Sequence, residues 1–315
     1  MVQCVSKMKM VTVIIPTIYS SDFTRLERAI HTVETAMKEA HDVGLKIIAV
    51  YNSAPEDIQE DILKRKLERL CDLSIAVLIN HINKGFAPAV NDGILYARAT
   101  VKPDWYLVLN DDAYIDKDFF VRLMPQIRSD TYDAVSCGIN TLTGERESVG
   151  LLYSSAGIAF PRRREISEKE TRLFSGTCVL LSGTLVENEL KRHGYVFNPH
   201  FFAYAEDLEL SLRILHDGGK IYISNNALVV HEGSQTAKRG SFFQLYHGYR
   251  NLVLVVLLMW PWSTIFWRLP LLMIGQAYMF AMTVYKGYWL LYPKLWWWVG
   301  KRRNSILWQR RSYDT

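Results

Sequence analysis

The chain has 315 residues, which is longer than one average domain and shorter than three, and favours one large domain with an appendage. With 49% hydrophobic, 22% charged and 12% aromatic residues it can form a sizeable core, which excludes a disordered or fibrous protein. Residues 1–250 carry 29 Lys and Arg against 31 Asp and Glu, whereas residues 251–315 carry 8 against 1 and hold eight of the nine tryptophans. A nucleic-acid binder would carry its basic patch on the folded domain, so this distribution argues against nucleic acid as a partner and favours a membrane surface.

The first 110 residues alternate between predicted strands and predicted helices. Val11 to Ile15 is a β-branched run ended by Pro16, which is typical of a buried parallel strand, and apolar residues follow at helical spacing over residues 22–40. The elements that continue this alternation are strand 46–51, helix 56–71, strand 73–79, helix 86–99 and strand 105–109. The pattern predicts a parallel sheet with helices on both faces.

The regular alternation ends after Asp112. The predicted elements there are helix 117–127, strand 133–138, strand 177–182, helices 184–193 and 206–217, and strands near 221–223 and 227–230. We therefore expect residues 1–250 to form one α/β domain, whose sheet has a parallel half and a mixed half.

Residues 251–315 form the predicted appendage. Two uncharged runs of 17 residues, 251–267 and 269–285, are each slightly short of the roughly 20 apolar residues that a spanning helix needs. The second run becomes long enough if it extends to Tyr292 and the Lys286 ammonium reaches the interface. We expect membrane-associated helices that either lie in the interface or include one C-terminal span. A buried helical subdomain or an oligomer interface is the alternative.

Tryptophans and cations occur together near the end of the chain. Trp296 to Trp298 and the following Lys301 to Arg303 are typical of an interfacial belt beside anionic headgroups. The N-terminus lacks an apolar region of signal-peptide length. The cysteines form no metal-binding motif and fit reduced thiols; they are Cys4, Cys71, Cys137 and Cys178. We expect the body of the protein at the cytoplasmic face of the inner or plasma membrane.

An acidic element follows the predicted strand that ends at Leu109. Asn110, Asp111 and Asp112 come directly after this strand, and ligands of open α/β sheets bind at the carboxyl ends of strands. Carboxylate oxygens suit Mg²⁺ or Mn²⁺, which usually also take substrate phosphates. The alternative is a solvated turn before the next helix.

Two further elements carry candidate residues. Glu206 and Asp207 stand at a predicted helix start, where the positive end of the helix dipole stabilises carboxylates. His231 directly follows a strand, and imidazole with carboxylates is a suitable donor set for Mn²⁺. Taken singly, the acidic pair is more typical of ordinary helix-terminal charge, and the histidine is more typical of a structural residue.

Together these elements resemble the inverting glycosyltransferases of family 2, and most closely their bacterial rhamnosyltransferase-like members. The matching stretches cover most of residues 11–251 and are Val11–Pro16, Asn83–Ala87, Asn91–Gly93, Asn110–Asp112, Phe174–Thr177, Phe202–Leu210, Val230–Ser234 and Tyr249–Asn251. The resemblance implies the GT-A fold, which is a Rossmann-like mixed sheet flanked by helices.

The resemblance also implies roles for particular residues. Asp112 and His231 would bind the divalent metal, Mn²⁺ or Mg²⁺, and Asp207 would be the general base with Glu206 beside it in the acceptor site. The residues that would bind the donor are Pro16, Thr17, Tyr51, Asn83, Lys84, Gly85, Asn110, Asp111 and Arg250. The family usually has an Asp where this chain has Tyr51, which can stack on a base but cannot accept a hydrogen bond from its imide as a carboxylate does.

The implied reaction is a metal-assisted single displacement from a nucleotide-diphospho-sugar to a hydroxyl of a lipid-linked glycan in cell-surface polysaccharide synthesis. The donor would be dTDP-rhamnose or a UDP-sugar, with rhamnose favoured and galactofuranose or a hexose as alternatives. A dinucleotide-dependent oxidoreductase is disfavoured because no Gly-x-Gly-x-x-Gly follows the first strand. A catalytically silent membrane scaffold remains as an alternative, against which the intact Asp112, Asp207 and His231 argue.

Overall fold

The computed structural model describes residues 8–20, 23–40, 42–167, 171–233, 240–311 and 313, so the predictions for Cys4 and Ser234 lie outside the described residues. In the first 110 residues, strands and helices alternate as predicted. The elements are β1 (Lys9–Ile18), α1 (Thr24–Glu39), β2 (Val43–Asn52), α2 (Glu60–Glu68), β3 (Ile75–Asn80), α3 (Phe86–Thr100) and β4 (Trp105–Leu109). The neighbouring pairs β1–β2, β2–β3 and β1–β4 are all parallel, which confirms the predicted parallel half.

Residues 113–231 add both parallel and antiparallel strands to the sheet. Its elements are β5 (Ala113–Ile115), α4 (Phe119–Arg128), β6 (Ala134–Thr141), β7 (Arg146–Ser148), β8 (Leu151–Tyr153), β9 (Ala159–Pro161), β10 (Cys178–Ser182), α5 (Gly183–His193), α6 (Glu206–His216) and β11 (Ile221–His231). β10 is antiparallel to β4 and to β6, whereas β11 is parallel to β6. The two strands predicted near 221–223 and 227–230 are one strand, whose register shifts between Ser224 and Val229.

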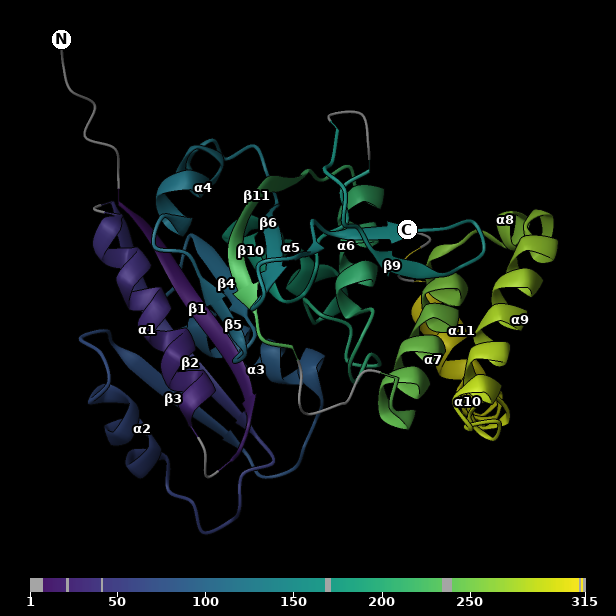
Figure 1. Cartoon of the computed structure of the whole chain (residues 1–315), viewed down its shortest axis with the longest axis horizontal. Coiled ribbons are helices and arrows are strands. Elements are labelled where there is room, and N and C mark those ends of the chain that lie inside the picture. Colours follow the sequence, from purple (N-terminus) through teal and green to yellow (C-terminus); the bar gives the residue numbers. More distant parts are fainter. Residues whose placement is uncertain are drawn as a thin grey trace.

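The described strands form one nine-stranded mixed sheet and one hairpin (Figure 1). The order in the sheet is β3-β2-β1-β4-β10-β6-β11-β5, with β7 paired to β6, and the hairpin consists of β8 and β9. The carboxyl ends of parallel strands lie at one edge of the sheet. This edge therefore brings together Thr17, Asn52 and Asn110. This mixed sheet agrees with the fold class expected from the sequence.

Helices cover both faces of the sheet. Residues of β1 alternate between the two cores, since Val13 and Ile15 pack in one cluster and Ile14 packs in the other. The first cluster includes side chains of α1, α2 and α4, and the second includes side chains of α3, α5 and α6. The sheet edge that carries the predicted site residues is thus held rigidly between two packed layers.

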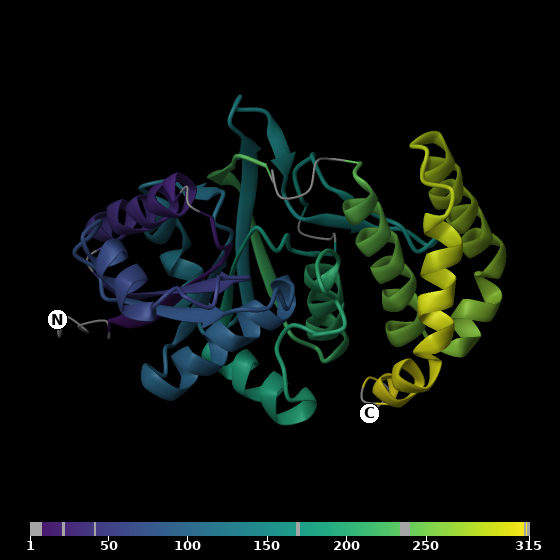
Figure 2. The same cartoon turned by 90° about the horizontal axis from the view of Figure 1, so that it is seen from below.

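The C-terminal helices form a separate group beside the α/β body, as Figure 2 shows. They are α7 (Phe242–Met259), α8 (Trp262–Trp267), α9 (Leu269–Tyr285), α10 (Leu291–Lys301) and α11 (Arg303–Arg310). α7 is continuous through the predicted domain boundary between residues 250 and 251, because its apolar side chains from Tyr246 to Leu258 form one core with Leu208 of α6. The helical region therefore begins at Phe242. Among the described helices, none has both the length and the apolar character to cross a membrane, so the expected C-terminal span is not confirmed.

Candidate active site

One cavity of about 1020 Å³ brings together most residues that the motifs singled out. It opens at the edge of the sheet where β1, β2 and β4 end. The predicted site residues that line it are Pro16, Thr17, Asn83, Gly85, Asn110, Asp111, Asp112, Glu206, Asp207 and His231. Motifs separated by more than a hundred residues therefore face one space.

Asp111 and Asp112 follow β4 directly. The Thr17 hydroxyl donates a hydrogen bond of 2.5 Å to Asp111 Oδ2 and so joins the ends of β1 and β4. Burial raises the pKa of Asp111 to about 6, while the Thr17 hydrogen bond opposes this rise and the charge of Asp112 adds to it. Asp112 is only 5% exposed. Two adjacent, enclosed carboxylates favour a cation beside them.

His231 ends β11 next to Asp112. Its Nε2 lies 3.3 Å from Asp112 Oδ1, and its Nδ1 lies 2.9 Å from Glu147 Oε2. Burial lowers the pKa of this imidazole, but the two carboxylates together outweigh burial and raise it to about 10. A metal ion binds the neutral ring, so metal binding at Nε2 would release this proton.

Glu147 is a site residue that the sequence reasoning missed. It belongs to the three-residue strand β7, and only the pairing of β7 with β6 brings it to His231. A carboxylate on the second nitrogen of a metal-binding histidine is a common arrangement that orients the ring. No motif surrounds Glu147, so the sequence carries no signal from which this contact could have been predicted.

The donor atoms at Asp112 and His231 fit a divalent metal. His231 Nε2 is buried, lies 3.3 Å from Asp112 Oδ1 and makes no aligned hydrogen bond to any described residue, so it offers a donor atom beside that carboxylate. Within the described ranges, no group of three or more His, Cys, Asp and Glu side chains is arranged to hold a metal ion. Mg²⁺ and Mn²⁺ sites commonly take their remaining ligands from substrate phosphate and water, so these two protein donors suit a metal that binds together with a phosphate-bearing ligand.

Asp207 is held at the start of α6 by backbone donors. Its Oδ2 accepts a hydrogen bond from Gly176 N and its Oδ1 accepts one from Leu208 N, each 2.8 Å long. Burial raises the pKa of Asp207 above its usual range, although both backbone hydrogen bonds oppose this rise. A Cβ at Gly176 would lie 3.3 Å from the Cβ of Asp207, so this contact requires a small residue in the Phe174–Thr177 motif.

Glu206 precedes Asp207 and also lines the cavity. It is 7% exposed, and its Oε2 has no hydrogen-bond partner among the described residues. Burial raises the pKa of Glu206 well above its usual range, and the neighbouring charge of Asp207 raises it further. This side chain therefore offers an unused hydrogen-bonding group to a ligand in the cavity.

The turn before α6 is strained and clamped. Tyr204 and Ala205 have φ of 70° and 62°, in the left-handed region that non-glycine residues rarely adopt. The Asn251 amide donates to Ala203 O at 2.8 Å and to Tyr204 O at 2.6 Å. Arg250 in turn donates to Asn251 Oδ1 through Nε and Nη2, at 2.8 and 2.7 Å. These contacts hold the first turn of α6 toward the cavity.

Arg250 was predicted to bind the donor, but it does not line the cavity. It is 4% exposed, and its guanidinium lies 4.5 Å from the ring centroid of Trp298. Its Nη2 also donates to His200 O at 3.2 Å. The side chain packs between α10 and the loop before α6, where Nε and Nη2 have hydrogen-bond partners, so its position is structural.

Asn52 shapes the loop that contains Asn83 and Gly85. Its Nδ2 donates to Asn83 Oδ1 at 3.2 Å and to Gly85 O at 3.0 Å, and its Oδ1 accepts from Lys84 N at 3.2 Å. Gly85 has φ of 92°, and a Cβ there would lie 2.3 Å from Phe202 O. The motif thus needs glycine at this position for two backbones to meet.

Two other predicted donor residues lie outside the cavity lining. Tyr51 is 1% exposed and packs in the core between Tyr19 and Phe23, because alternate residues of β2 face opposite sides and Asn52 takes the cavity side. The Lys84 ammonium pairs with Asp92 of α3 at 2.9 Å. Only the backbone of Lys84 takes part in the loop that Asn52 holds.

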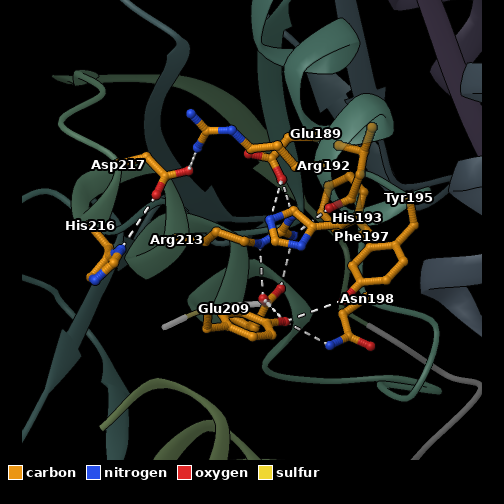
Figure 3. Close-up of polar contacts among 12 residues, drawn as sticks. Glu189, Arg192, His193, Tyr195, Phe197, Asn198, Glu209, Arg213, His216 and Asp217 are labelled. Atoms are coloured by element: carbon orange, nitrogen blue, oxygen red, sulfur yellow. Dashed lines mark hydrogen bonds and ion pairs between the residues drawn. The ribbon is translucent and has the colours of Figure 1, made fainter. Parts of the chain in front are cut away.

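A buried polar network anchors α6 to α5 (Figure 3). The Arg213 guanidinium donates to Glu209 Oε1 at 3.0 Å, to Val196 O at 2.6 Å and to Glu189 of α5. The Tyr313 hydroxyl donates to Glu209 Oε1 at 2.6 Å and so ties the C-terminal end of the described chain to α6. The helix that begins with Glu206 and Asp207 is held at both ends.

Comparisons with known proteins agree with this architecture. The model of the family described as glycosyl transferase family 2 matches residues 12–188. The fold is similar to the crystal structure of GalNAc-T7 with UDP, GalNAc and Mn²⁺, with a TM-score of 0.56 and 16% identity over 81% of this chain and 49% of that chain. It is also similar to Staphylococcus aureus TarS 1–349 in complex with UDP, with a TM-score of 0.51 and 15% identity over 78% of this chain and 64% of that chain.

The chain is shorter than both of the chains that it matches. The chain spans about half of the matched GalNAc-T7 chain and under two thirds of the matched TarS chain. At such identities the likeness shows the fold alone. Among curated proteins, none is similar enough in sequence to count as a relative.

Proposed function

The chain belongs to glycosyl transferase family 2 and is a glycosyltransferase, and from this we propose that it transfers a sugar from a nucleotide-diphospho-sugar to a hydroxyl of a lipid-linked glycan with inversion. The observation that supports this proposal is the shared cavity of Asp112, His231 and Asp207. A cation site and a candidate base face one space, as a single displacement at the anomeric carbon requires.

The donor end of the cavity is the edge formed by β1, β4 and the loop at Asn83. Asp112 and His231 are the residues that would hold a divalent metal, which would supply Lewis-acid stabilisation of the leaving diphosphate when bound. Glu147 would keep the His231 ring oriented through Nδ1. Asp111, held by Thr17, would accept a hydrogen bond from the donor.

Asp207 would act as the general base. Its two backbone hydrogen bonds hold the carboxylate in place, so that it can remove the proton of the acceptor hydroxyl as that oxygen attacks. The raised pKa brings Asp207 closer to neutral pH and makes it a stronger base than an exposed aspartate. Attack from the side of the base, opposite the diphosphate, inverts the anomeric centre.

Rhamnose from dTDP-rhamnose is the donor that we favour, because the motifs most resemble rhamnosyltransferase-like members. UDP-sugars are the alternative, and both solved neighbours were crystallised with UDP. A galactofuranose or hexose donor would use the same metal and base. Since Tyr51 is buried in the core, the base of the nucleotide would be recognised without the carboxylate that the family usually has there.

The acceptor is proposed to be a lipid-linked glycan of cell-surface polysaccharide synthesis at the cytoplasmic face of the membrane. Large apolar side chains of α8, α9 and α10 are exposed, and Lys286 and Lys301 lie beside Tyr285 and Trp297. Trp267 and Tyr285 are each 80% exposed. Such a surface suits peripheral binding to anionic lipids.

A thermal-shift screen of nucleotide-sugars with and without Mn²⁺ tests this proposal. Ligands that bind the folded state raise the melting temperature, and one present at 100 times its dissociation constant stabilises by about 2.7 kcal/mol. We expect one nucleotide-sugar to raise it in a Mn²⁺-dependent manner. A silent scaffold would respond to none of them, and that outcome would overturn the proposal.

The contact between Glu147 and His231 gives a second test. Replacing Glu147 with glutamine keeps a hydrogen bond to Nδ1 but removes the charge, and we expect Mn²⁺ to bind roughly 10- to 100-fold more weakly. Calorimetric titration of Mn²⁺ with UDP present measures this change. Glu145→Gln, two residues away in the turn before β7, is the control and should leave the affinity unchanged. Equal affinity in Glu147→Gln and the wild type would remove Glu147 from the site.

A further inference from the structure

Part of the cavity that Asp207 lines has apolar walls. We call this region the apolar arm; the residues that form it are Leu151, Ala159, Phe160, Leu245, Gly248, Tyr249, Leu252 and Met282. They come from the β8–β9 hairpin, from α7 and from α9. A nucleotide-sugar is polar and anionic, so it would leave these walls without a matching surface.

The walls of the apolar arm are held together by close packing between the hairpin and the C-terminal helices. A Cβ at Gly275 of α9 would lie 2.2 Å from Ala156 O, so the hairpin turn touches the backbone of that helix. The Tyr153 ring packs against Trp260 with centroids 5.8 Å apart. The arm is therefore part of the packed fold.

A cation lies on the wall of the cavity where α9 ends. Lys286 lines the cavity with Gly240, and a Cβ at Gly240 would lie 3.5 Å from Lys286 Nζ. Within the described ranges the Lys286 ammonium has no carboxylate partner and lies 5.7 Å from the Tyr285 ring centroid. A positive charge beside an apolar channel complements an amphiphile that carries phosphate.

Apolar side chains are exposed on α9 and directly after it, close to Lys286 in the sequence. Met273, Ile274, Val284 and Tyr285 of α9, and Trp289 after it, are all more than two fifths exposed. The helix that contributes Met282 and Lys286 to the cavity thus carries apolar side chains on its outer surface as well. A lipid chain in the apolar arm would lie close to the surface proposed to contact the bilayer.

We propose that the apolar arm binds the hydrocarbon chain of a phosphate-linked lipid acceptor, with Lys286 beside its phosphate. The inference rests on the proposed function, since it assigns the acceptor end of the same cavity. Asp207 and Glu206 line the same cavity as the arm, so the hydroxyl of such an acceptor would reach the base while its chain stays among apolar side chains.

Gly248 allows the apolar arm to be filled without disturbing the fold. It lies within α7, and a Cβ built on it meets no atom within 4 Å. Gly248→Leu therefore projects a side chain into the arm and should raise helix stability, because glycine costs up to roughly 1 kcal/mol in a helix. Gly300 of α10 is the matched control, since it is helical, has equally open space at its Cβ and lies outside the cavity lining.

The probe is farnesyl phosphate, an isoprenoid monophosphate, titrated by calorimetry below its micelle concentration. We expect Gly248→Leu to weaken its binding roughly tenfold or more, which corresponds to the loss of about two buried methylene groups. Gly300→Leu should bind it as the wild type does. Lys286→Gln should weaken farnesyl phosphate roughly threefold, as expected for one exposed ion pair, and leave farnesol unchanged.

Other outcomes would overturn the inference. Equal farnesyl phosphate affinity in Gly248→Leu and Gly300→Leu would show that the arm holds no chain. Displacement of the probe by an equal concentration of lysophosphatidylcholine would identify the arm as a bulk phospholipid site. A wild type that fails to bind UDP or dTDP with Mn²⁺ would instead refute the proposed function, whatever the probe does, so the two failures are distinguishable.

Discussion

Replacing Asp207 with asparagine is expected to lower the rate of sugar transfer about 1000-fold, because a positioned general base contributes roughly 10² to 10⁴ in rate. Asparagine has the same shape and can still accept one backbone hydrogen bond, but it cannot take a proton. Donor affinity should stay unchanged, because Asp207 is proposed to act on the acceptor and not on the donor. The measurement is nucleotide release with the donor identified by the screen, together with donor affinity by calorimetry.

Asp130→Asn is the matched control for this substitution. Asp130 is exposed, pairs with Lys9 and has φ of 48°, which asparagine tolerates well. Its rate should equal that of the wild type. Turnover retained in Asp207→Asn would exclude Asp207 as the base.

The pH dependence of the transfer rate tests the role of Asp207 independently. The base must be unprotonated, so the wild-type rate should fall as the pH drops through the pKa of Asp207. Burial raises this pKa, so the fall should begin above the value of about 3.9 that is typical of an exposed aspartate. A profile of Asp207→Asn that keeps the same acid limb would contradict this assignment.

The second large effect concerns the anchor of α6. Arg213→Met is expected to destabilise the fold by about 3 to 5 kcal/mol, because it leaves the buried carboxylates of Glu189 and Glu209 without their cation. For a chain of this size, each 1 kcal/mol lowers the melting temperature by roughly 2 to 4 °C. Chemical denaturation and thermal melts measure the change.

Arg192→Met is the matched control for the anchor. Arg192 pairs with Asp217 in the same region, but its side chain is 58% exposed, and exposed pairs contribute about 0 to 1 kcal/mol. Figure 3 shows both arginines with their partners. A loss in Arg213→Met no larger than that in Arg192→Met would contradict the anchoring role.

The fold was predictable wherever an element was long enough to carry a hydrophobic period. The helix predicted over 86–99 ends one residue later, at Thr100, and the strand predicted over 11–15 is two to three residues longer at each end, from Lys9 to Ile18. β5, β7, β8 and β9 have three residues each, too few for a period, and were missed. Their positions depend on pairing with distant strands, which the sequence does not display.

The site was predictable where residue type and strand end coincided. Asp112, Asp207 and His231 each follow or begin a recognisable element, and the sheet brings them to one cavity. The predictions for Tyr51 and Arg250 were wrong. A side chain reaches the cavity only if it points to the cavity side of its strand or helix, and the motif does not show this direction. Tyr51 faces the core and Arg250 faces Trp298. Glu147 has no local signal at all.

The C-terminal region shows the same limit for helices. The second uncharged run was expected to span a bilayer only if it continued to Tyr292, but its helix ends at Tyr285 and Gly287 follows. The first run was short of a span, and Pro261 ends its helix at Met259. The tryptophans that suggested a membrane surface are in large part exposed, as Trp262, Trp267 and Trp308 show. Binding to vesicles remains a prediction.

The central question is whether the acidic residues and His231 form one donor site. The most direct measurement is calorimetric titration of UDP or dTDP into the wild type and into Asp112→Ala, each with and without Mn²⁺. We expect tight nucleotide binding only in the wild type with Mn²⁺, and the loss of this metal dependence in Asp112→Ala. Nucleotide affinity that is equal in both proteins, and equally dependent on Mn²⁺, would show that the metal and the donor bind elsewhere.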